Sequence, residues 1–207
     1  MRKQIRPYLL NDNDVELLGV LEAHGVYLWK NNITLNQEQF HDRRDLLKES
    51  IREHLITEQG RLCAYCGLSI REHTPAIEHI ADKSKPKYRH VMFNPLNLVL
   101  ACGTCNGAKG IQDAASSWTG DYSSWSFLIV HPILDNPSDH IEFDPDFVVI
   151  TNVHTTKGQK TIDWFHLQKE VMLNERLRHF KASQNLVSPE MEDLIQQSIS
   201  IPRVRSR

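Results

Sequence analysis

Two Cys-x-x-Cys pairs constrain the fold of this chain more than any other feature of the sequence. The four cysteines of the chain are Cys63, Cys66, Cys102 and Cys105. Four thiolates at this spacing are typical of one tetrahedral zinc ion, which would join two distant parts of the chain. Gly67 follows the first pair and Gly103 lies within the second. Glycine tolerates the left-handed backbone that such knuckles often need.

The alternatives to a zinc site are two disulfides, buried free thiols or a redox pair. Disulfides persist in oxidising compartments, and residues 1–7 lack the apolar run of a secretory signal. Two Cys-x-x-Cys pairs close together also fit a structural metal better than a redox centre. We therefore expect a structural zinc in a cytoplasmic protein, with no membrane involved because no apolar run is long enough to span one.

Polar residues between and after the two pairs follow a spaced pattern. The sequence reads Glu78-His79-Ile between the pairs, then Asn97-Leu-Val-Leu, and Asn106-x-x-Lys109-Gly after the second pair. With these features in this order, residues 61–110 resemble the HNH endonuclease family, in the zinc-stapled branch that has the ββα-metal fold. The resemblance implies a nuclease that hydrolyses phosphodiesters and leaves a 5′-phosphate and a 3′-hydroxyl.

Each of these positions has a chemical reason in that reaction, which needs an activated water and a cation on the scissile phosphate. His79 matches the general base, because an unperturbed imidazole can accept a proton at neutral pH. Glu78 offers a hard oxygen ligand suited to Mg²⁺ or Mn²⁺. The resemblance implies that Asn106 is the second ligand of this ion, that Asn97 braces the loop and orients the base, and that Lys109 contacts phosphate near the start of a helix.

Three residues depart from the common family pattern. Glu78 replaces Asp, Asn106 replaces His, and Asp82 stands where proline is frequent. Asp82 is either a further ligand or solvated, and we favour a solvated carboxylate. The alternative for the whole motif is a zinc scaffold that kept its fold and lost its chemistry.

Charge favours a nucleic-acid partner locally. The chain carries a formal charge of −2, yet residues 61–110 contain seven Lys or Arg and only three Asp or Glu. If the loop after His79 is extended, its basic residues share one face and can follow a phosphate backbone. These residues are Lys83, Lys85, Lys87 and Arg89, and Lys109 is added to them. Residues 110–156 lack Lys and Arg and are acidic, so we expect this stretch to face away from nucleic acid and to shape the fold or bind a protein. Its aromatic residues Trp118, Tyr122 and Trp125 would either fill the core or anchor a protein interface.

Periodicity and turn signals divide the remaining sequence. Apolar residues at i, i+4 spacing predict a helix over 38–59 that ends at Gly60. We also expect helices over 14–24 and 168–180, the latter with Leu173, Leu177 and Phe180 on one side, and a last helix from Ser188. Strands are expected at 127–130, 141–143, 147–150 and 161–165, arranged as a β-meander. The expected organisation is an N-terminal helical segment (1–60), the nuclease core (61–112) and a strand-and-helix extension (113–207).

A second resemblance covers most of the chain. The motif from His131-Pro to Asp139-His140-Ile, the following Phe-Asp-Pro, and Gly158 with Thr161-Ile resemble HNH proteins encoded with retron and Septu antiphage modules. In those modules the HNH subunit acts with an ABC-type ATPase, which implies the same kind of partner here. His131 and His140 could bind metal, although hydrogen bonds that stabilise turns are the favoured interpretation.

These observations predict an α+β protein with a ββα-metal nuclease core. It would cut DNA with one structural zinc and one catalytic divalent ion, held by Glu78 and Asn106. The alternative is a catalytically silent, zinc-ribbon-like module that binds DNA or a protein partner without cutting.

Overall fold

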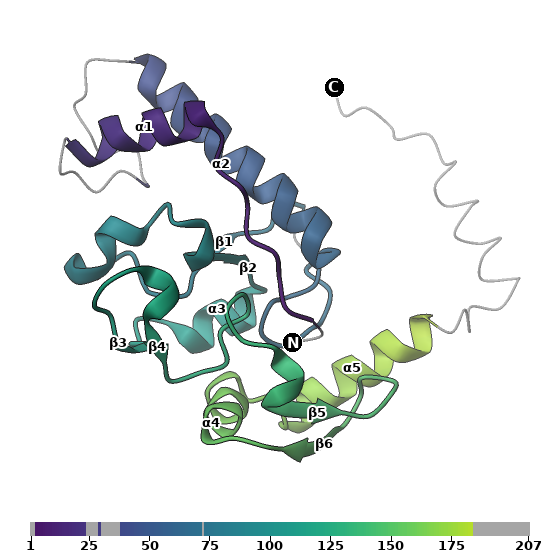
Figure 1. The fold of residues 1–207 in the computed structure, drawn as a ribbon. Coiled ribbons are helices and arrows are strands. Elements are labelled where there is room, and N and C mark those ends of the chain that lie inside the picture. The colour runs from purple at the N-terminus through teal and green to yellow at the C-terminus, as the bar shows by residue number, and fades with distance from the viewer. Residues whose placement is uncertain (1–2, 24–28, 30–37, 72, 184–207) are drawn as a thin grey trace, which may run out of the picture.

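The computed structural model describes residues 3–23, 29, 38–71 and 73–183, which form a mixed α+β arrangement (Figure 1). Two helices come first, followed by three small two-stranded sheets with helices between and after them. The helices are α1 (Asp12–Ala23), α2 (Glu38–Gln59), α3 (Gly103–Lys109), α4 (Thr156–Phe165) and α5 (Glu170–Ser183). The strands are β1 (Ile77–His79), β2 (Leu98–Leu100), β3 (Ala115–Ser117), β4 (Ser126–Phe127), β5 (Ile141–Phe143) and β6 (Ile150–Val153).

Helix α2 confirms the periodicity of the sequence. Leu47, Ile51 and Leu55 are at most 3% exposed, and they form the apolar side of the helix. The helix stops before Gly60, whose φ of 58° is left-handed and costs glycine little. Helix α1 begins two residues before the predicted start at Asp14 and packs on α2.

The end of α2 is fixed to the central hairpin by one buried glutamine. The Gln59 side chain accepts a hydrogen bond from Leu100 N at 2.8 Å and donates to Leu100 O at 3.0 Å. It thereby pairs with the edge of β2 as a neighbouring strand would. This contact places the chain that leaves α2, which carries the first cysteine pair, beside β2.

The β1–β2 hairpin and α3 together carry the predicted motif. The strands are antiparallel, with Glu78 opposite Val99 and His79 opposite Leu98. The connection between them contains two short 3₁₀ helices, η1 (Pro86–Val91) and η2 (Pro95–Asn97). Helix α3 follows β2 after two residues, so two strands and a helix occur in the predicted order.

The predicted β-meander is wrong. Strand β4 pairs with β3 and β5 pairs with β6, so residues 115–153 form two separate two-stranded sheets. The apolar run at 128–130 follows β4 without being part of a strand, and Ile129 and Val130 are fully buried. An apolar run of this length reports burial and does not by itself determine a strand.

The predicted turn at Gly158 and strand at 161–165 are also wrong, because both lie in α4. Thr155 caps this helix, since its side chain accepts a hydrogen bond from Gly158 N. A Cβ at Gly158 would lie 2.4 Å from the His140 carbonyl oxygen, so glycine is needed for close packing of α4 on the β5 segment. The glycine that suggested a turn therefore marks a helix contact.

Helix α5 confirms the element predicted at 168–180 but buries a different side. Met172 and Arg176 are 5% and 3% exposed, whereas Leu173 and Leu177 are 36% and 37% exposed. Arg176 is buried because its guanidinium donates to the carbonyls of Val148 and Leu167 at 2.8 Å and 2.6 Å. The helix predicted from Ser188 lies outside the described residues.

One hydrophobic core extends from Ile5 to Met172. The N-terminal segment runs along α2 toward the C-terminal half (Figure 1), where Ile5 N donates to Pro132 O at 2.9 Å. Arg6 forms an ion pair with Glu58 near the end of α2 at 2.7 Å. The three segments predicted from the sequence thus share contacts and a core.

Candidate metal centre and active site

The four cysteines meet in one cluster. Their Sγ atoms lie within 4.8 Å of one another, and those of Cys66 and Cys102 are 3.9 Å apart. Tetrahedral zinc with Zn–S bonds of about 2.3 Å sets sulfur–sulfur distances of about 3.8 Å. All four cysteines are free, so the structure contains no disulfide among them. The cluster could hold a metal ion such as zinc, and it would join the chain after α2 to the start of α3.

The backbone and the protonation of two of the four thiols fit this role. Gly67 has a φ of 70°, as the knuckle prediction requires, whereas Gly103 begins α3 and has no left-handed φ. Hydrogen bonds from Cys102, Cys105 and Cys66, in that order, lower the pKa of Cys63 well below its ordinary value. A hydrogen bond from Cys105 lowers the pKa of Cys102 as well, whereas hydrogen bonds to Cys102 raise the pKa of Cys66 and Cys105. The cluster therefore stabilises the thiolate, which is the form that binds a metal, at Cys63 and Cys102.

His79 ends β1 and is 1% exposed. Its Nε2 atom lies 3.0 Å from the Met92 carbonyl oxygen. A carbonyl only accepts, so Nε2 carries the proton and Nδ1 has a free lone pair. Among the described residues, Nδ1 has no hydrogen-bond partner. The ring of Trp29 meets the imidazole edge-on, with 4.3 Å between ring centroids.

Burial, and then the charge of Lys83, hold the pKa of His79 well below its ordinary value. The hydrogen bond to Met92 opposes this shift only in part. The imidazole is consequently neutral at pH 7, which is the form that can accept a proton.

Glu78 precedes His79 and interacts with α3. Lys109 Nζ lies 2.7 Å from Glu78 Oε1, and both side chains are less than 10% exposed. The contact is an ion pair by distance, although its angle is not that of a directed hydrogen bond. The predicted place of Lys109 near the start of the helix is wrong, because Lys109 is the last residue of α3. The prediction that it contacts phosphate is untested, and in this structure Lys109 neutralises the carboxylate.

Asn97 is fully buried and binds the loop that follows His79. Its Oδ1 accepts from Ala81 N at 2.7 Å, and its Nδ2 donates to Ala81 O at 3.2 Å and Val91 O at 3.1 Å. Asn106 lies on α3, half-buried, one turn before Lys109. Residues three apart share one face of a helix, so Asn106 and the Glu78 partner Lys109 lie on the same side of α3.

The loop after His79 is not extended throughout, because Pro86–Val91 form η1, so the condition for its basic residues to share one face is not met. Lys85 and Lys87 both form ion pairs with Asp113, at 3.3 Å and 2.6 Å. Lys87 Nζ also lies 3.8 Å from the centre of the Trp118 ring. The basic loop and the beginning of the acidic stretch therefore lie side by side, so they are not the separate surfaces that the charge pattern indicated.

Three other residues considered as metal ligands make ordinary hydrogen bonds. Asp82 accepts from the backbone N–H and the hydroxyl of Ser84 at 2.9 Å and 2.6 Å. His131 Nδ1 accepts from two backbone N–H groups, and His140 Nδ1 lies 2.8 Å from the Thr155 hydroxyl. Among the described residues, the four cysteines are the one group of three or more metal-binding side chains of the His, Cys, Asp and Glu types. The contacts favour the turn-stabilising interpretation of both histidines.

Two residues near the site had no signal in the sequence. Trp29 lies in the stretch 27–33, whose pattern is ambiguous, and it contacts His79 from far away in the chain. Tyr122 donates a hydrogen bond to Asn97 Oδ1 at 2.9 Å from the acidic stretch. Tyr122 stands between polar residues, Asp121 and Ser123, and only the fold reveals where its hydroxyl points.

These features define a mixed α+β protein in which a cysteine cluster adjoins a β-hairpin whose first strand ends in a buried, neutral histidine. No family model matches the chain, and no solved structure matches it. None of the described helices is long and apolar enough to cross a membrane.

Curated proteins of two kinds are similar to the chain. Septu protein PtuB of Bacillus thuringiensis is 28% identical over 122 residues, which cover 59% of this chain and 42% of that protein. Septu protein PtuB of Bacillus mycoides (strain KBAB4) is 23% identical over 199 residues, 86% of this chain and 65% of that protein. The protein named "Retron Vc95 putative HNH endonuclease", of Vibrio cholerae serotype O1 biovar El Tor, is 24% identical over 182 residues, 84% of this chain and 82% of that protein. The predicted resemblance to HNH proteins of Septu and retron modules is confirmed, and the chain spans less than two thirds of each Septu relative.

Proposed function

We propose that this protein is a metal-dependent HNH endonuclease that cuts DNA in antiphage defence. The observation that carries the proposal is the state of His79, whose Nε2 is held by the Met92 carbonyl while Nδ1 keeps a free lone pair. The neighbouring Glu78, the following α3 and the cysteine cluster give this histidine the surroundings that the HNH resemblance requires. Similarity to a retron protein named as an HNH endonuclease supports the same activity.

The residues of the chain divide the work of hydrolysis. His79 Nδ1 accepts the proton of the attacking water, and the Met92 carbonyl stabilises the imidazolium that results. Glu78 and Asn106 offer the hard oxygen atoms that Mg²⁺ or Mn²⁺ prefers, and a bound ion would stabilise charge on the scissile phosphate. Zinc in the cysteine cluster would be structural, because four thiolates leave no open position.

Substrate binding falls to the basic residues around the site. Lys83, Lys85, Lys87, Arg89 and Lys109 are the proposed phosphate contacts. Since Asp113 offsets part of the charge of Lys85 and Lys87, these two contribute less to the salt dependence of binding than two free lysines. His79 is almost fully buried, so phosphate and water reach it after the side chains over the imidazole rearrange.

The proposed partner is an ABC-type ATPase encoded beside this protein. Similarity to Septu proteins supports a role within a defence module, where the resemblance implies such an ATPase. Co-expression and co-purification of the two proteins test the partnership, and cleavage is then measured with and without the ATPase.

The experiment that tests the activity is metal-dependent cleavage of supercoiled plasmid by the purified protein, alone and with its ATPase. His79→Ala should reduce the rate by ~10²–10⁴-fold, because it removes a general base, and should leave folding and zinc content unchanged. His73→Ala is the matched control, since His73 is exposed and lies in the same segment. Equal cleavage by His79→Ala and the parent protein would contradict the assignment. DNA binding without metal-dependent cleavage in any mixture would favour the silent binding module instead.

A further inference from the structure

The side-chain amide of Asn97 has only one possible orientation. One of its ends faces the Ala81 N–H, which is a donor, and the other faces the carbonyls of Ala81 and Val91, which are acceptors. The oxygen must therefore face Ala81 N and the nitrogen must face the two carbonyls. The Tyr122 hydroxyl, 2.9 Å from this oxygen, must donate its proton to Asn97.

The position of the proton on His131 is fixed in the same way. The Tyr122 hydroxyl donates its one proton to Asn97, so it can only accept a hydrogen bond from His131 Nε2, which lies 3.2 Å away. His131 Nε2 must therefore carry a hydrogen. Independently, His131 Nδ1 accepts from Ile133 N at 3.2 Å and Leu134 N at 3.1 Å, so Nδ1 has no hydrogen. His131 is therefore the neutral Nε2–H tautomer, and burial lowers its pKa to about 3.

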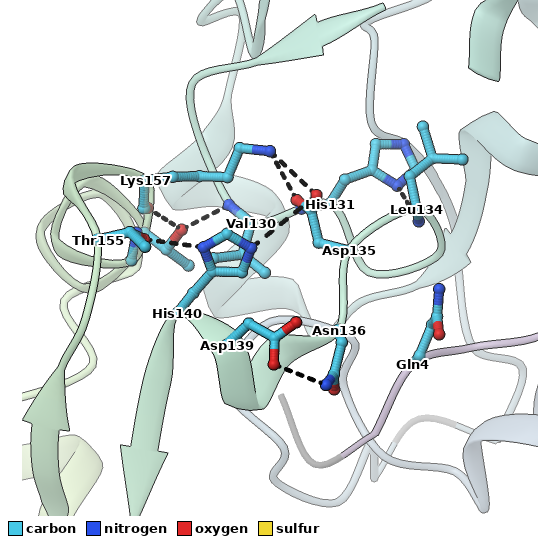
Figure 2. Close-up of polar contacts among 12 residues, drawn as sticks. Gln4, Val130, His131, Leu134, Asp135, Asn136, Asp139, His140, Thr155 and Lys157 are labelled. Carbon is cyan, nitrogen blue, oxygen red and sulfur yellow. Dashed lines mark hydrogen bonds and ion pairs between the residues drawn. The ribbon is translucent and has the colours of Figure 1, made fainter. Parts of the chain in front are cut away.

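His131 is itself held by the C-terminal half of the chain (Figure 2). Its backbone N–H donates to Asp135 Oδ2 at 2.7 Å, and Lys157 of α4 lies 2.8 Å from the same oxygen. The preceding Val130 N donates to the Thr161 hydroxyl at 2.7 Å. A series of hydrogen bonds, here called the relay, thus leads from α4 through His131 and Tyr122 to Asn97.

At its other end, the relay reaches the loop that surrounds His79, the proposed base. Asn97 binds Ala81, two residues after His79, and Val91, next to the Met92 carbonyl that holds the imidazole. Tyr122 lies between Trp125 and Phe127, at centroid distances of 4.7 Å and 5.5 Å, where a phenylalanine would fill nearly the same volume. A buried hydroxyl is costly unless it is hydrogen-bonded, and here both of its bonds serve the relay.

We propose that Tyr122 is a positioning residue for His79, and that His131 orients Tyr122. Together they hold Asn97, and through it they keep the Met92 carbonyl in line with His79 Nε2. This inference rests on the proposed function, in which His79 is the base. It assigns a role in catalysis to two residues outside the predicted nuclease core at 61–112.

The test is Tyr122→Phe, which removes one hydroxyl and keeps the ring. We expect kcat for plasmid or oligonucleotide cleavage to fall by about 10- to 100-fold with KM unchanged, because misplacing a catalytic group by ~1 Å has effects of this size. The nitrogen chemical shifts of the His79 ring should show the Nε2–H tautomer in the parent protein and a mixture of tautomers in the variant. Tyr8→Phe is the matched control, since it removes a hydroxyl that donates to Asp14 and plays no part in the relay.

His131→Asn tests the second half of the relay. The shorter amide keeps an oxygen near the Nδ1 position for Ile133 and Leu134 N–H, and it loses the donor to Tyr122. Because both residues act through one path, the double variant should lose no more kcat than Tyr122→Phe alone. Additive losses would overturn the relay.

The outcomes separate this inference from the proposed function. If the parent protein cleaves, His79→Ala does not, and Tyr122→Phe matches Tyr8→Phe in kcat and in the His79 tautomer, the positioning role is wrong and the base assignment stands. A loss in Tyr122→Phe that follows only the folded fraction, with the tautomer unchanged, also overturns the role. If His79→Ala cleaves like the parent protein, the proposed function fails first.

Discussion

Trp29 packs against the buried His79, and we expect it to limit the access of water to the imidazole. Its ring covers the imidazole edge-on, and Lys48 and Lys83 lie 5.4 Å and 5.8 Å from its centre. Since burial is the main reason for the low pKa of His79, Trp29→Ala should raise that pKa toward 6.5. An NMR titration of the His79 ring measures the change. Trp118→Ala is the control, because Trp118 packs beside Tyr88 and Lys87 instead, and an unchanged pKa in Trp29→Ala would contradict the covering role.

His131 makes the stability of the fold depend on pH. Its pKa is lowered from 6.5 to about 3 in the folded protein, so between these values the unfolded chain binds one more proton. The free energy of unfolding should therefore fall as the pH decreases through this window, by about 1.4 kcal/mol per pH unit from this group. Denaturant unfolding at pH 7, 6 and 5 checks it, with His131→Asn as the comparison that lacks this contribution. Equal pH dependence in both proteins would show that His131 does not stay neutral.

At the scale of elements, α4 is placed by the absence of a side chain at Gly158. Ala would put its Cβ 2.4 Å from the His140 carbonyl oxygen, and the helix must then move away from β5. Gly158→Ala should destabilise the protein by about 1–3 kcal/mol despite the better helix propensity of alanine. Gly19→Ala in α1 meets no atom within 4 Å and should be neutral or slightly stabilising. Thermal or denaturant unfolding measures the stability of both variants. Equal stability of Gly158→Ala and Gly19→Ala would contradict the close contact at Gly158.

Sequence patterns predicted some elements well and others poorly, for physical reasons. Helix α2 is long and has a regular apolar side, and the cysteine spacing reflects local knuckle geometry, so both could be read directly. The sheets after α3 have strands of two to four residues, too short for an alternating pattern to identify. The burial of Arg176 and the contact of Trp29 with His79 depend on tertiary packing, which no local pattern contains.

At the scale of the whole molecule, the cysteine cluster joins α2, the hairpin and α3. We expect about one zinc per chain by elemental analysis, contributing on the order of 10 kcal/mol to folding, as in small zinc domains. Removal of zinc with a strong chelator should unfold this region, and the loss of protected amide protons over residues 61–110 measures it. Restoration of protection by zinc but not by magnesium is the control. Folded protein without zinc would refute a structural metal.

If Glu78 binds the catalytic cation and Lys109 binds phosphate, as proposed, their ion pair would link cofactor binding to substrate binding. In the structure, the ammonium group already balances the carboxylate that a divalent cation would need. On this proposal, binding of the cation would be an exchange, in which Lys109 leaves Glu78 and pairs with another anion. A phosphate of the nucleic acid is the natural recipient, so each ligand should raise the affinity for the other by the same factor. In the proposed nuclease, such reciprocity would keep metal occupancy low until DNA binds, which would limit cleavage in the absence of the substrate.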